Sequence, residues 1–297
     1  MENWFAKILR NPFTGDSLEF DEKACILRDT RGSTFQMAGD IPVFTNTPPQ
    51  TDITFDYTRH YTKDAEIFDY FEEDNDPIQS KHLKMLRKTL TKKVPRQSLL
   101  LLDVGCGCAF VAKEFANSDK CVVSLDIALA NAKKAFEKYH YKKHAAVVAD
   151  AYQLPFADGT FDCIIASEII EHTVNPQAFV ASLLSKIKDN GTLLISTPYK
   201  EKIGYSLCVH CNCKTPHNAH LHSFDKKKIQ NIVNSLPATI RNMQLVGNKA
   251  LLRSHLITPL SKFGFYIWKF FDKTANLLIP KSEHFVITLT KNAQPQT

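Results

Sequence analysis

The alternation of short apolar runs with amphipathic segments after residue 98 constrains the fold more than any other feature of this sequence. Five apolar runs are typical of buried strands, and they cover residues 99–104, 121–126, 145–150, 161–167 and 191–197. Helical stretches such as NAKKAFEKYH and PQAFVASLLSKIK separate these runs. The pattern predicts an α/β domain with a parallel sheet and helices on both faces. Two later runs, 239–246 and 284–290, add two further strands.

A glycine turn follows the first predicted strand in the stretch LLLDVGCGCAFVA. Gly105 and Gly107 let the backbone approach a ligand closely, and the helix that follows presents free N–H groups and a positive end. Nineteen residues after Gly107, the second strand ends in Asp126. An acid at this place accepts hydrogen bonds from both hydroxyls of a ribose, so the turn predicts a nucleotide-like cofactor.

The spacing around the turn separates two classes of cofactor. A dinucleotide fingerprint needs a small residue three positions after Gly107, where this chain has Phe110. The alternative pattern is an acid followed by G-x-G-x-G/A. It is satisfied by Asp103, Gly105, Gly107 and Ala109. The sequence therefore favours the second pattern over an NAD site.

This motif and strand order resemble the class I S-adenosylmethionine-dependent methyltransferases of the type 11 kind, over residues 98–292. Further support comes from LPFADGTFDCIIASEIIEH, from the NG before the fifth strand and from the TPY after it. The resemblance implies a Rossmann-like, seven-stranded, mostly parallel sheet with helices on both faces. It also implies S-adenosyl-L-methionine as the cofactor.

The cofactor-binding residues that the resemblance implies lie in the glycine turn and at the strand ends. They are Asp103, Gly105, Cys106, Gly107, Asp126, Ile127, Asp150, Ala151 and Ser167. Asp150 ends the third strand, where its carboxylate would accept from the adenine amine. Asp103 has a second interpretation, in which it caps the next helix, and Asp150 can also end a strand for solubility.

Catalytic candidates follow the fourth and fifth strands. The imidazole of His172 can take a proton near neutral pH, which makes it a candidate for a general base. In the alternative interpretation, the Glu171-His172 pair only orders the turn. Tyr199 follows the fifth strand and is a candidate for lining the acceptor pocket.

The loop CVHCNCKTPHNAHLH, residues 208–222, packs three cysteines and four histidines between the fifth strand and the next helix. One interpretation is a lid that brings His220 or His222 near the acceptor. A second is a zinc site, for which the ligands would be Cys208, Cys211, Cys213 and His217. Against zinc, C-x-x-C-x-C lacks a matching second pair, and a third interpretation is a redox-active cysteine pair.

The N-terminal 1–47 segment reads as a small module of antiparallel strands broken by glycines. It resembles the zinc-ribbon-like β domain that precedes some bacterial methyltransferases. Asn11 and Thr14 occupy the positions of a C-x-x-C pair, so we expect no zinc there. Residues 48–97 read as a linker with Pro48 and Pro49 and a helical segment.

The methyltransferase domain is expected over residues 98–292, with insertions at 199–223 and 251–280. In the second insertion Leu260, Phe263, Ile267, Phe271 and Leu278 fall near one helical face, beside several lysines. The segment 251–279 is either a helix packed on the domain, a lid over an apolar acceptor, or an interfacial helix that contacts a membrane or lipid.

Composition limits the remaining alternatives. The chain has 297 residues, 44% hydrophobic, and a formal net charge of +6 with lysines in clusters. No run of about 18 apolar residues is present, and the start lacks the apolar core of a signal peptide, so we expect a cytoplasmic protein.

The sequence predicts a methyltransferase for a small-molecule or lipid- or sugar-linked acceptor. Alternatives are an RNA methyltransferase, which the basic runs suggest, and a non-catalytic cofactor-binding partner subunit. Nucleic acid is less expected, because SEII stands where N-P-P-Y or D-P-P-Y often marks such enzymes.

Overall fold

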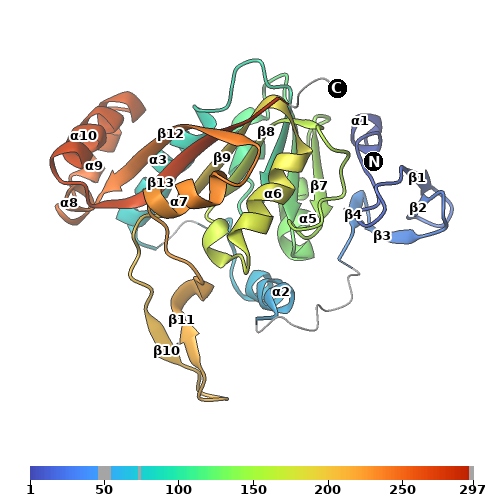
Figure 1. The fold of residues 1–297 in the computed structure, drawn as a ribbon, viewed down its shortest axis with the longest axis horizontal. Coiled ribbons are helices and arrows are strands. Elements are labelled where there is room, and N and C mark those ends of the chain that lie inside the picture. Colours follow the sequence, from blue (N-terminus) through green and yellow to red (C-terminus); the bar gives the residue numbers. More distant parts are fainter. Residues whose placement is uncertain (46–54, 73–74, 294–297) are drawn as a thin grey trace.

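The computed structural model describes residues 1–45, 55–72 and 75–293 (Figure 1). Its largest feature is one sheet in the order β1-β2-β3-β4-β7-β6-β5-β8-β9-β13-β12. The predicted linker around Pro48 and Pro49, and with it the boundary between residues 47 and 48, lies outside the described residues.

The centre of this sheet is parallel and confirms the predicted α/β domain. Its strands are β5 (Leu100–Val104), β6 (Cys121–Asp126), β7 (His144–Val148), β8 (Phe161–Ser167) and β9 (Ile187–Pro198). The two later strands are β12 (Ala238–Asn248) and β13 (Ser282–Lys291). β13 runs antiparallel to both β9 and β12, which completes a Rossmann-like set of seven strands.

The N-terminal strands extend this sheet instead of forming a sheet of their own. After α1 (Asn3–Ala6) come β1 (Leu18–Asp21), β2 (Ile26–Asp29), β3 (Thr34–Ala38) and β4 (Ile41–Val43). Val43 of β4 pairs in parallel with Val148 of β7, and Leu9 shares a core with Phe156. The predicted small β module is therefore present, but it is continuous with the seven strands.

Helices cover both faces of the sheet because successive strand residues point to opposite sides. On one side Leu101 packs with α3 (Pro77–Thr91), α4 (Phe110–Phe115) and α10 (Phe265–Leu278). On the other side Leu102 packs with α6 (Pro176–Lys186) and α7 (Lys226–Val233). Beside the N-terminal strands, α5 (Leu129–Lys138) packs on β6 and β7.

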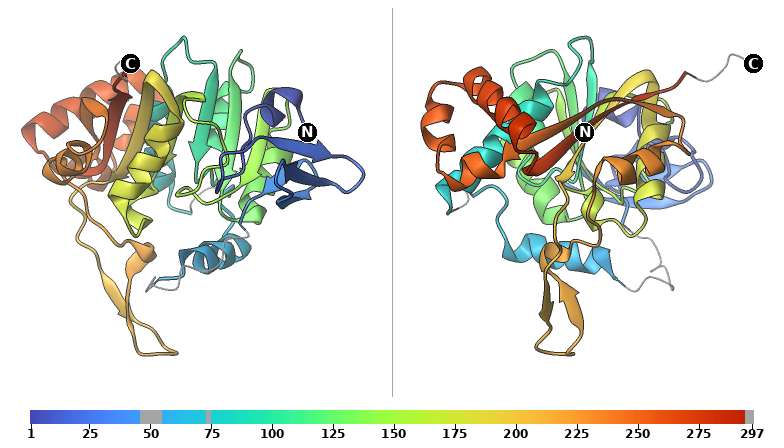
Figure 2. Two further views of the ribbon diagram at one scale, coloured as in Figure 1. Left: turned by 45° about the vertical axis from the view of Figure 1, so that its right-hand side comes forward. Right: turned by 60° about the vertical axis from the view of Figure 1, so that its left-hand side comes forward.

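Three short segments gather at the carboxyl ends of the parallel strands. They are α2 (Tyr57–Ile67), the 3-10 turn η1 (Ile170–His172) and a hairpin of β10 (Tyr205–Leu207) and β11 (Lys214–Pro216). Figures 1 and 2 show α2 and the hairpin on the same side of the sheet. The hairpin leads through η2 (His217–Ala219) back to the domain, so the insertion at 199–223 returns to the strand ends.

The second insertion, 251–280, is helical. It holds most of α8 (Lys249–Arg253), α9 (Ile257–Lys262) and α10, which lie beside β12 and β13 at one end of the molecule (Figure 1). In the part of the chain that the structure describes, no helix is long and apolar enough to cross a membrane.

Candidate functional site

The glycine turn after β5 has the geometry that the sequence predicts. Gly105 adopts a φ of 63°, a left-handed conformation that favours glycine, and a Cβ there would lie 2.2 Å from Cδ1 of Ile169. The next residue, Cys106, donates its backbone N–H to the carbonyl of Leu125 at 2.9 Å. The turn is therefore held against the neighbouring strand, with its backbone exposed toward the cleft described below.

Asp126 is positioned by hydrogen bonds at the carboxyl end of β6. Its carboxylate accepts from the backbone N–H of Gly107 at 3.2 Å and of Ala128 at 3.0 Å, and from the side-chain amide of Asn131 at 3.4 Å. Burial raises the pKa of Asp126, and these hydrogen bonds counteract that effect. The carboxylate is thus fixed beside the glycine turn, as the cofactor prediction requires.

Asp103 lies elsewhere. Its side chain is buried beneath the turn and does not line the cleft. Burial, reinforced by Asp126, raises its pKa well above the ordinary value, while a hydrogen bond from the backbone of Val111 lowers it. Direct contact between Asp103 and a cofactor is therefore not supported. Its position matches the alternative interpretation, in which it orders the helix that follows.

Asp150 meets a residue that the sequence did not indicate. The hydroxyl of Tyr57, from α2, donates to its carboxylate at 2.5 Å, and the backbone N–H of Tyr152 donates at 2.9 Å. Burial, together with Asp150, raises the pKa of Tyr57 well above its ordinary value, so Tyr57 remains a donor. At the predicted adenine end of the site, α2 therefore lines the cleft, and Tyr57 takes up one of the positions at which the Asp150 carboxylate can accept a hydrogen bond.

One cleft of about 1090 Å³ contains most of the predicted site residues. The cofactor set that lines it is Gly105, Cys106, Gly107, Asp126, Ile127, Asp150, Ala151 and Ser167. His172, Tyr199 and His220 line it too, but His222 does not. The ring of His222 lies instead 5.9 Å from that of Phe224.

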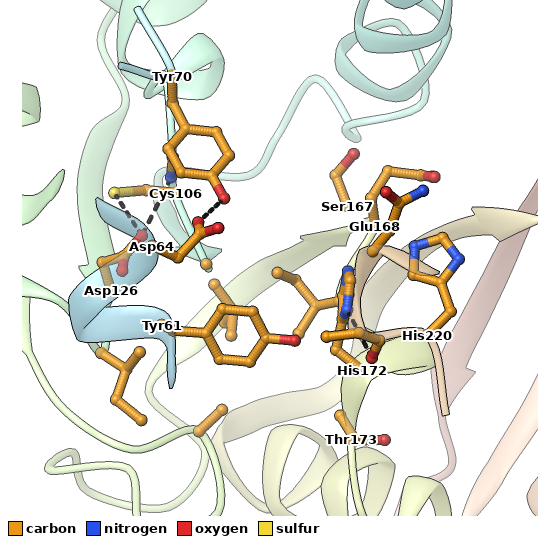
Figure 3. A pocket seen from close by; sticks show the side chains of 18 of the residues that line it. Tyr61, Asp64, Tyr70, Cys106, Asp126, Ser167, Glu168, His172, Thr173 and His220 are labelled. Carbon is orange, nitrogen blue, oxygen red and sulfur yellow. Dashed lines mark hydrogen bonds between the residues drawn. The ribbon is translucent and has the colours of Figure 1, made fainter. Parts of the chain in front are cut away.

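Sequence reasoning missed the wall that α2 contributes. Tyr57, Tyr61 and Asp64 recur at helical spacing and all line the cleft. Figure 3 shows Tyr61 and Asp64 on this wall. Asp64 accepts a hydrogen bond from the hydroxyl of Tyr70, whose ring covers Gly107. The sequence shows these residues at the spacing of one helix face. It does not indicate that this face lines the cleft.

At the other end of the cleft, His172 is enclosed by aromatic rings. Tyr61 lies edge-on to it at 5.6 Å between ring centres, and His220 lies at 4.8 Å. Burial, with a smaller effect of His220, lowers the pKa of His172 to about 4. The imidazole is therefore neutral at physiological pH and can accept a hydrogen bond, and the lowered pKa makes it a weaker base than a solvent-exposed imidazole.

Glu171, His172 and His220 are the three described residues whose ligand atoms gather as a metal would require, all within 4.8 Å of one another. His220 also pairs with Glu201, at 2.5 Å from Nδ1 to Oε2. Burial and the neighbouring Glu168 raise the pKa of Glu171 well above its ordinary value. Carboxylate and imidazole ligands of this kind can hold a divalent cation.

Glu168 was not predicted, and it also lines the cleft. It accepts hydrogen bonds from Nε2 of His284 at 2.9 Å and from the hydroxyl of Ser196 at 2.6 Å. Burial alone would raise the pKa of Glu168, but His284 and Ser196 lower it. For His284 the effects are reversed. Burial alone would lower its pKa, but the neighbouring carboxylate of Glu168 raises it. The pair is therefore ionised at neutral pH.

His82, from α3, completes this chain of contacts. Its Nε2 lies 2.6 Å from Nδ1 of His284, in a fully buried position. Burial and His284 lower the pKa of His82 to about 3, so it is neutral and accepts from His284. Gly247 leaves room for the His82 ring, since a Cβ there would lie 2.1 Å from Cε1.

The four predicted zinc ligands do not gather into one site, although the thiol of Cys211 contacts those of Cys208 and Cys213. Cys208, Cys211 and Cys213 lie at the tip of the β10–β11 hairpin with free thiols, away from the cleft. His217 stands at the base of the hairpin, with Nε2 2.7 Å from the hydroxyl of Ser206. Zinc held by these four residues is therefore not supported by the structure. The redox interpretation remains a prediction, and backbone hydrogen bonds from Cys211 and His210 lower the pKa of Cys208.

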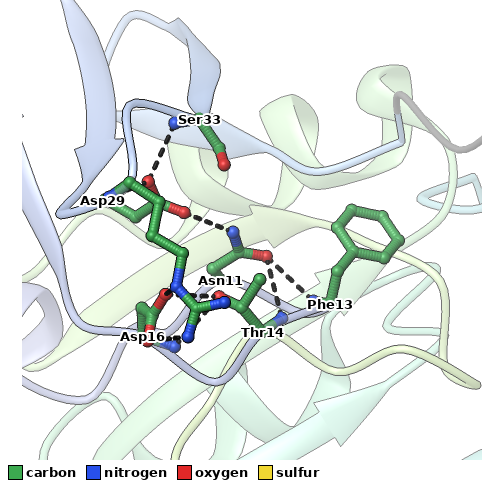
Figure 4. A network of polar contacts seen from close by, with 7 residues as sticks. Asn11, Phe13, Thr14, Asp16, Asp29 and Ser33 are labelled. Carbon is green, nitrogen blue, oxygen red and sulfur yellow. Dashed lines mark hydrogen bonds and ion pairs between the residues drawn. The ribbon is translucent and has the colours of Figure 1, made fainter.

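The N-terminal segment uses hydrogen bonds where the resemblance places a cysteine pair (Figure 4). The amide of Asn11 donates to Asp29 at 2.6 Å, and its oxygen accepts from the backbone of Phe13 and Thr14. Burial would raise the pKa of Asp29, but hydrogen bonds from Asn11 and Ser33 lower it to about 2. The zinc-ribbon-like character of this module stays a prediction.

Comparison with known proteins supports the methyltransferase fold of the central part of the chain. Residues 102–195 match the family model described as “Methyltransferase domain”. The chain is 34% identical over 113 residues to the “Ubiquinone biosynthesis O-methyltransferase” of Rickettsia felis. That match covers 37% of this chain and 45% of the relative, so the chain spans less than half of that protein's length.

Solved structures share the fold at low sequence identity. The N-methyltransferase NodS from Bradyrhizobium japonicum, in complex with S-adenosyl-L-homocysteine, aligns with a TM-score of 0.51 and 13% identity. The alignment covers 80% of this chain and all of NodS. The [4+2]-cyclase SpnF aligns equally well, at 0.51 and 15% identity, over 76% of this chain and 86% of the cyclase. The fold therefore hosts more than one activity.

Proposed function

We propose that this protein methylates the oxygen of a small-molecule or lipid- or sugar-linked acceptor. The premise is that residues 102–195 are a methyltransferase domain with the class I S-adenosylmethionine-dependent fold. One observation carries the proposal. A single cleft joins the glycine turn and Asp126 to an end lined by Glu168, His172 and Tyr199. Cofactor and acceptor would thus share one enclosure.

The residues present fit the cofactor. Gly105 and Gly107 leave the backbone free for close approach, Asp126 would accept from ribose hydroxyls, and Asp150 from the adenine amine. S-adenosylmethionine supplies a reactive sulfonium methyl when bound, so the protein's part is to bind and to orient. Tyr57 and Tyr61 would cover the bound cofactor from the α2 side.

The acceptor would enter beside Glu168 and His172. The ionised carboxylate of Glu168 can accept a hydrogen bond from a hydroxyl, and neutral His172 can receive its proton. Transfer needs the acceptor oxygen about 3 to 3.5 Å from the methyl carbon, so these contacts would also align it. The name of the Rickettsia felis relative, an O-methyltransferase, supports oxygen as the acceptor atom.

RNA is disfavoured as an acceptor by the charges around the cleft. Glu168, Glu201 and Glu283 line the cleft, where their carboxylates would repel phosphates, and Lys249 lines it too, 3.5 Å from Glu283. Part of the basic surface is already paired, since Lys134 contacts Asp69 and Lys88 contacts Glu114.

The eight free thiols suit a reducing compartment such as the cytoplasm.

Methyl transfer can be tested by offering labelled S-adenosylmethionine with fractionated metabolite, lipid and RNA pools. We expect label in a metabolite or lipid fraction, in a form stable to mild base, as a methyl ether is and a methyl ester is not. Asp126→Ala is the matched negative control, and Asp119→Asn, at an exposed carboxylate, is the matched positive one.

The outcomes separate the alternatives. Label in RNA would replace the proposal with the RNA alternative. Binding of S-adenosylhomocysteine by calorimetry, with no label in any pool, would favour the non-catalytic partner subunit. Absence of both binding and label would exclude both cofactor-dependent functions.

A further inference from the structure

The outer face of α10 is apolar, although it faces solvent. Tyr266, Phe270 and Leu277 are 71%, 65% and 83% exposed. Neighbouring exposed side chains widen the patch, and they are Leu256, Phe263, Ile267, Phe271, Leu278 and Ile279. We call this set the α10 patch. A patch of contiguous large apolar side chains marks an interaction surface, whereas single exposed side chains do not.

Hydrogen bonds on the inner face hold the helix in this orientation. Trp268, Asp272 and Asn276 recur every four residues and are buried. The carboxylate of Asp272 accepts from the backbone N–H of Gly247 at 3.1 Å and of Asn248 at 2.7 Å. Rotating the helix to bury its apolar face would expose Trp268 and leave these backbone N–H groups without their acceptor. Both changes would lower the stability of the fold. The patch is therefore fixed outward.

The charge around the patch is one-sided. Between residues 249 and 281 the chain has six basic side chains and a single acid, and that acid is the inward-facing Asp272. Lys262, Lys269 and Lys273 belong to α9 and α10 themselves. An apolar helix face flanked by lysines is the pattern of a helix that lies in the interface of an anionic membrane.

We propose that the α10 patch binds the surface of an anionic lipid bilayer, with its aromatic and leucine side chains at the boundary between headgroups and acyl chains. Two copies of the patch would bring like charges together, which disfavours self-association through it. The side chains of the patch project outward from the helix, so the flat surface of a bilayer can contact them and no partner with a groove is required. This inference is independent of the proposed methyl transfer.

Co-sedimentation of the full chain with vesicles tests the proposal. The vesicles would contain either phosphatidylcholine alone or equal parts of phosphatidylcholine and phosphatidylglycerol. We expect binding to the anionic vesicles at low salt, weaker binding as salt increases, and little binding to phosphatidylcholine. The double variant Phe270→Ser/Leu277→Ser removes two exposed apolar side chains and should weaken binding about tenfold or more.

Two further variants sharpen the test. Val209→Ser removes an equally exposed apolar side chain from the hairpin tip, and its binding should match that of the wild type. Lys262→Glu/Lys273→Glu should abolish the preference for anionic vesicles. Circular dichroism and melting curves establish that each variant is folded.

The proposal is overturned by any of three results. One is no binding to anionic vesicles at low salt. Another is binding that Phe270→Ser/Leu277→Ser leaves unchanged. The third is a wild-type dimer in sedimentation experiments that the same double variant dissociates, because that would make a second copy the occupant.

Discussion

The imidazole of His284, on β13, donates to the carboxylate of Glu168 across 2.9 Å, although the two residues are 116 positions apart in the sequence. The contact joins the acceptor end of the cleft to β13, the strand that runs antiparallel between β9 and β12. His284 is almost fully buried, so the ion pair is shielded from solvent on that side. Glu168 thus owes its ionised state to a residue outside the loop that carries it.

Removing this partner should destabilise the protein. His284→Gln leaves the Glu168 carboxylate partly buried without a counter-charge, and breaking a buried pair in this way costs about 3 kcal/mol. Urea unfolding at pH 7 measures the loss. The control is Lys88→Gln, which breaks a half-exposed pair with Glu114 and should cost at most about 1 kcal/mol. Equal losses would contradict a special role for the His284 pair.

A second prediction concerns pH. Burial lowers the pKa of His144 to about 4, in a site where Nε2 contacts Ser124 and Nδ1 contacts the carbonyl of Tyr139. The unfolded chain binds a proton near pH 6.5, but the folded chain does not until about pH 4. Stability from this residue is therefore complete above pH 6.5 and is lost as pH falls through that window.

The stability lost to His144→Gln should accordingly be about 2 kcal/mol smaller at pH 5 than at pH 7.5. Urea unfolding of both proteins at the two pH values measures this difference. NMR titration of the His144 ring gives the pKa directly. A ring that titrates near pH 6.5 would contradict the prediction.

A third prediction addresses the cofactor end. Asp126→Ala removes the acceptor expected for the ribose hydroxyls, so affinity for S-adenosylhomocysteine should fall about tenfold to a hundredfold. Isothermal titration calorimetry measures it, with Asp119→Asn as the control that should bind like the wild type. Affinity unchanged in Asp126→Ala would place the ribose elsewhere in the cleft.

A fourth prediction concerns the N-terminal strands. Asn11→Ala removes a donor to Asp29, so the pKa of Asp29 should rise from about 2 toward its ordinary value. The melting temperature should fall at neutral pH, and the fall should diminish as pH drops from about 4 to 2, where Asp29 takes up its proton. Thr14→Ala is the comparison, because its hydroxyl contacts only Asp16 at the surface.

The sequence predicted the seven central strands because each is a run of apolar residues with a clear period and turn signals at its ends. The same logic located Gly105, Gly107 and Asp126, whose roles depend on local geometry. It placed Asp103 in the cleft, however, because the motif does not show which side of the turn the carboxylate takes.

Features that depend on long-range contacts were not predictable. Nothing local indicates that Val43 pairs with Val148, so the N-terminal module read as separate. Glu168 and His284 are each unremarkable in the sequence until the fold brings them together. In α10 the apolar residues suggested a packed face, but the helix is anchored by Asp272 and Asn276, which the pattern of hydrophobicity ignores.

The last prediction tests His172, and it depends on the proposed methyl transfer. His172→Ala removes a neutral imidazole that can take the acceptor's proton, so turnover at saturating cofactor should fall about a hundredfold. Affinity for S-adenosylhomocysteine should stay within about twofold, because the expected cofactor contacts lie at the other end of the cleft. His222→Ala is the matched control, since that ring faces Phe224 outside the cleft. If His172→Ala turned over like the wild type, the imidazole would be a wall of the acceptor site and not its base.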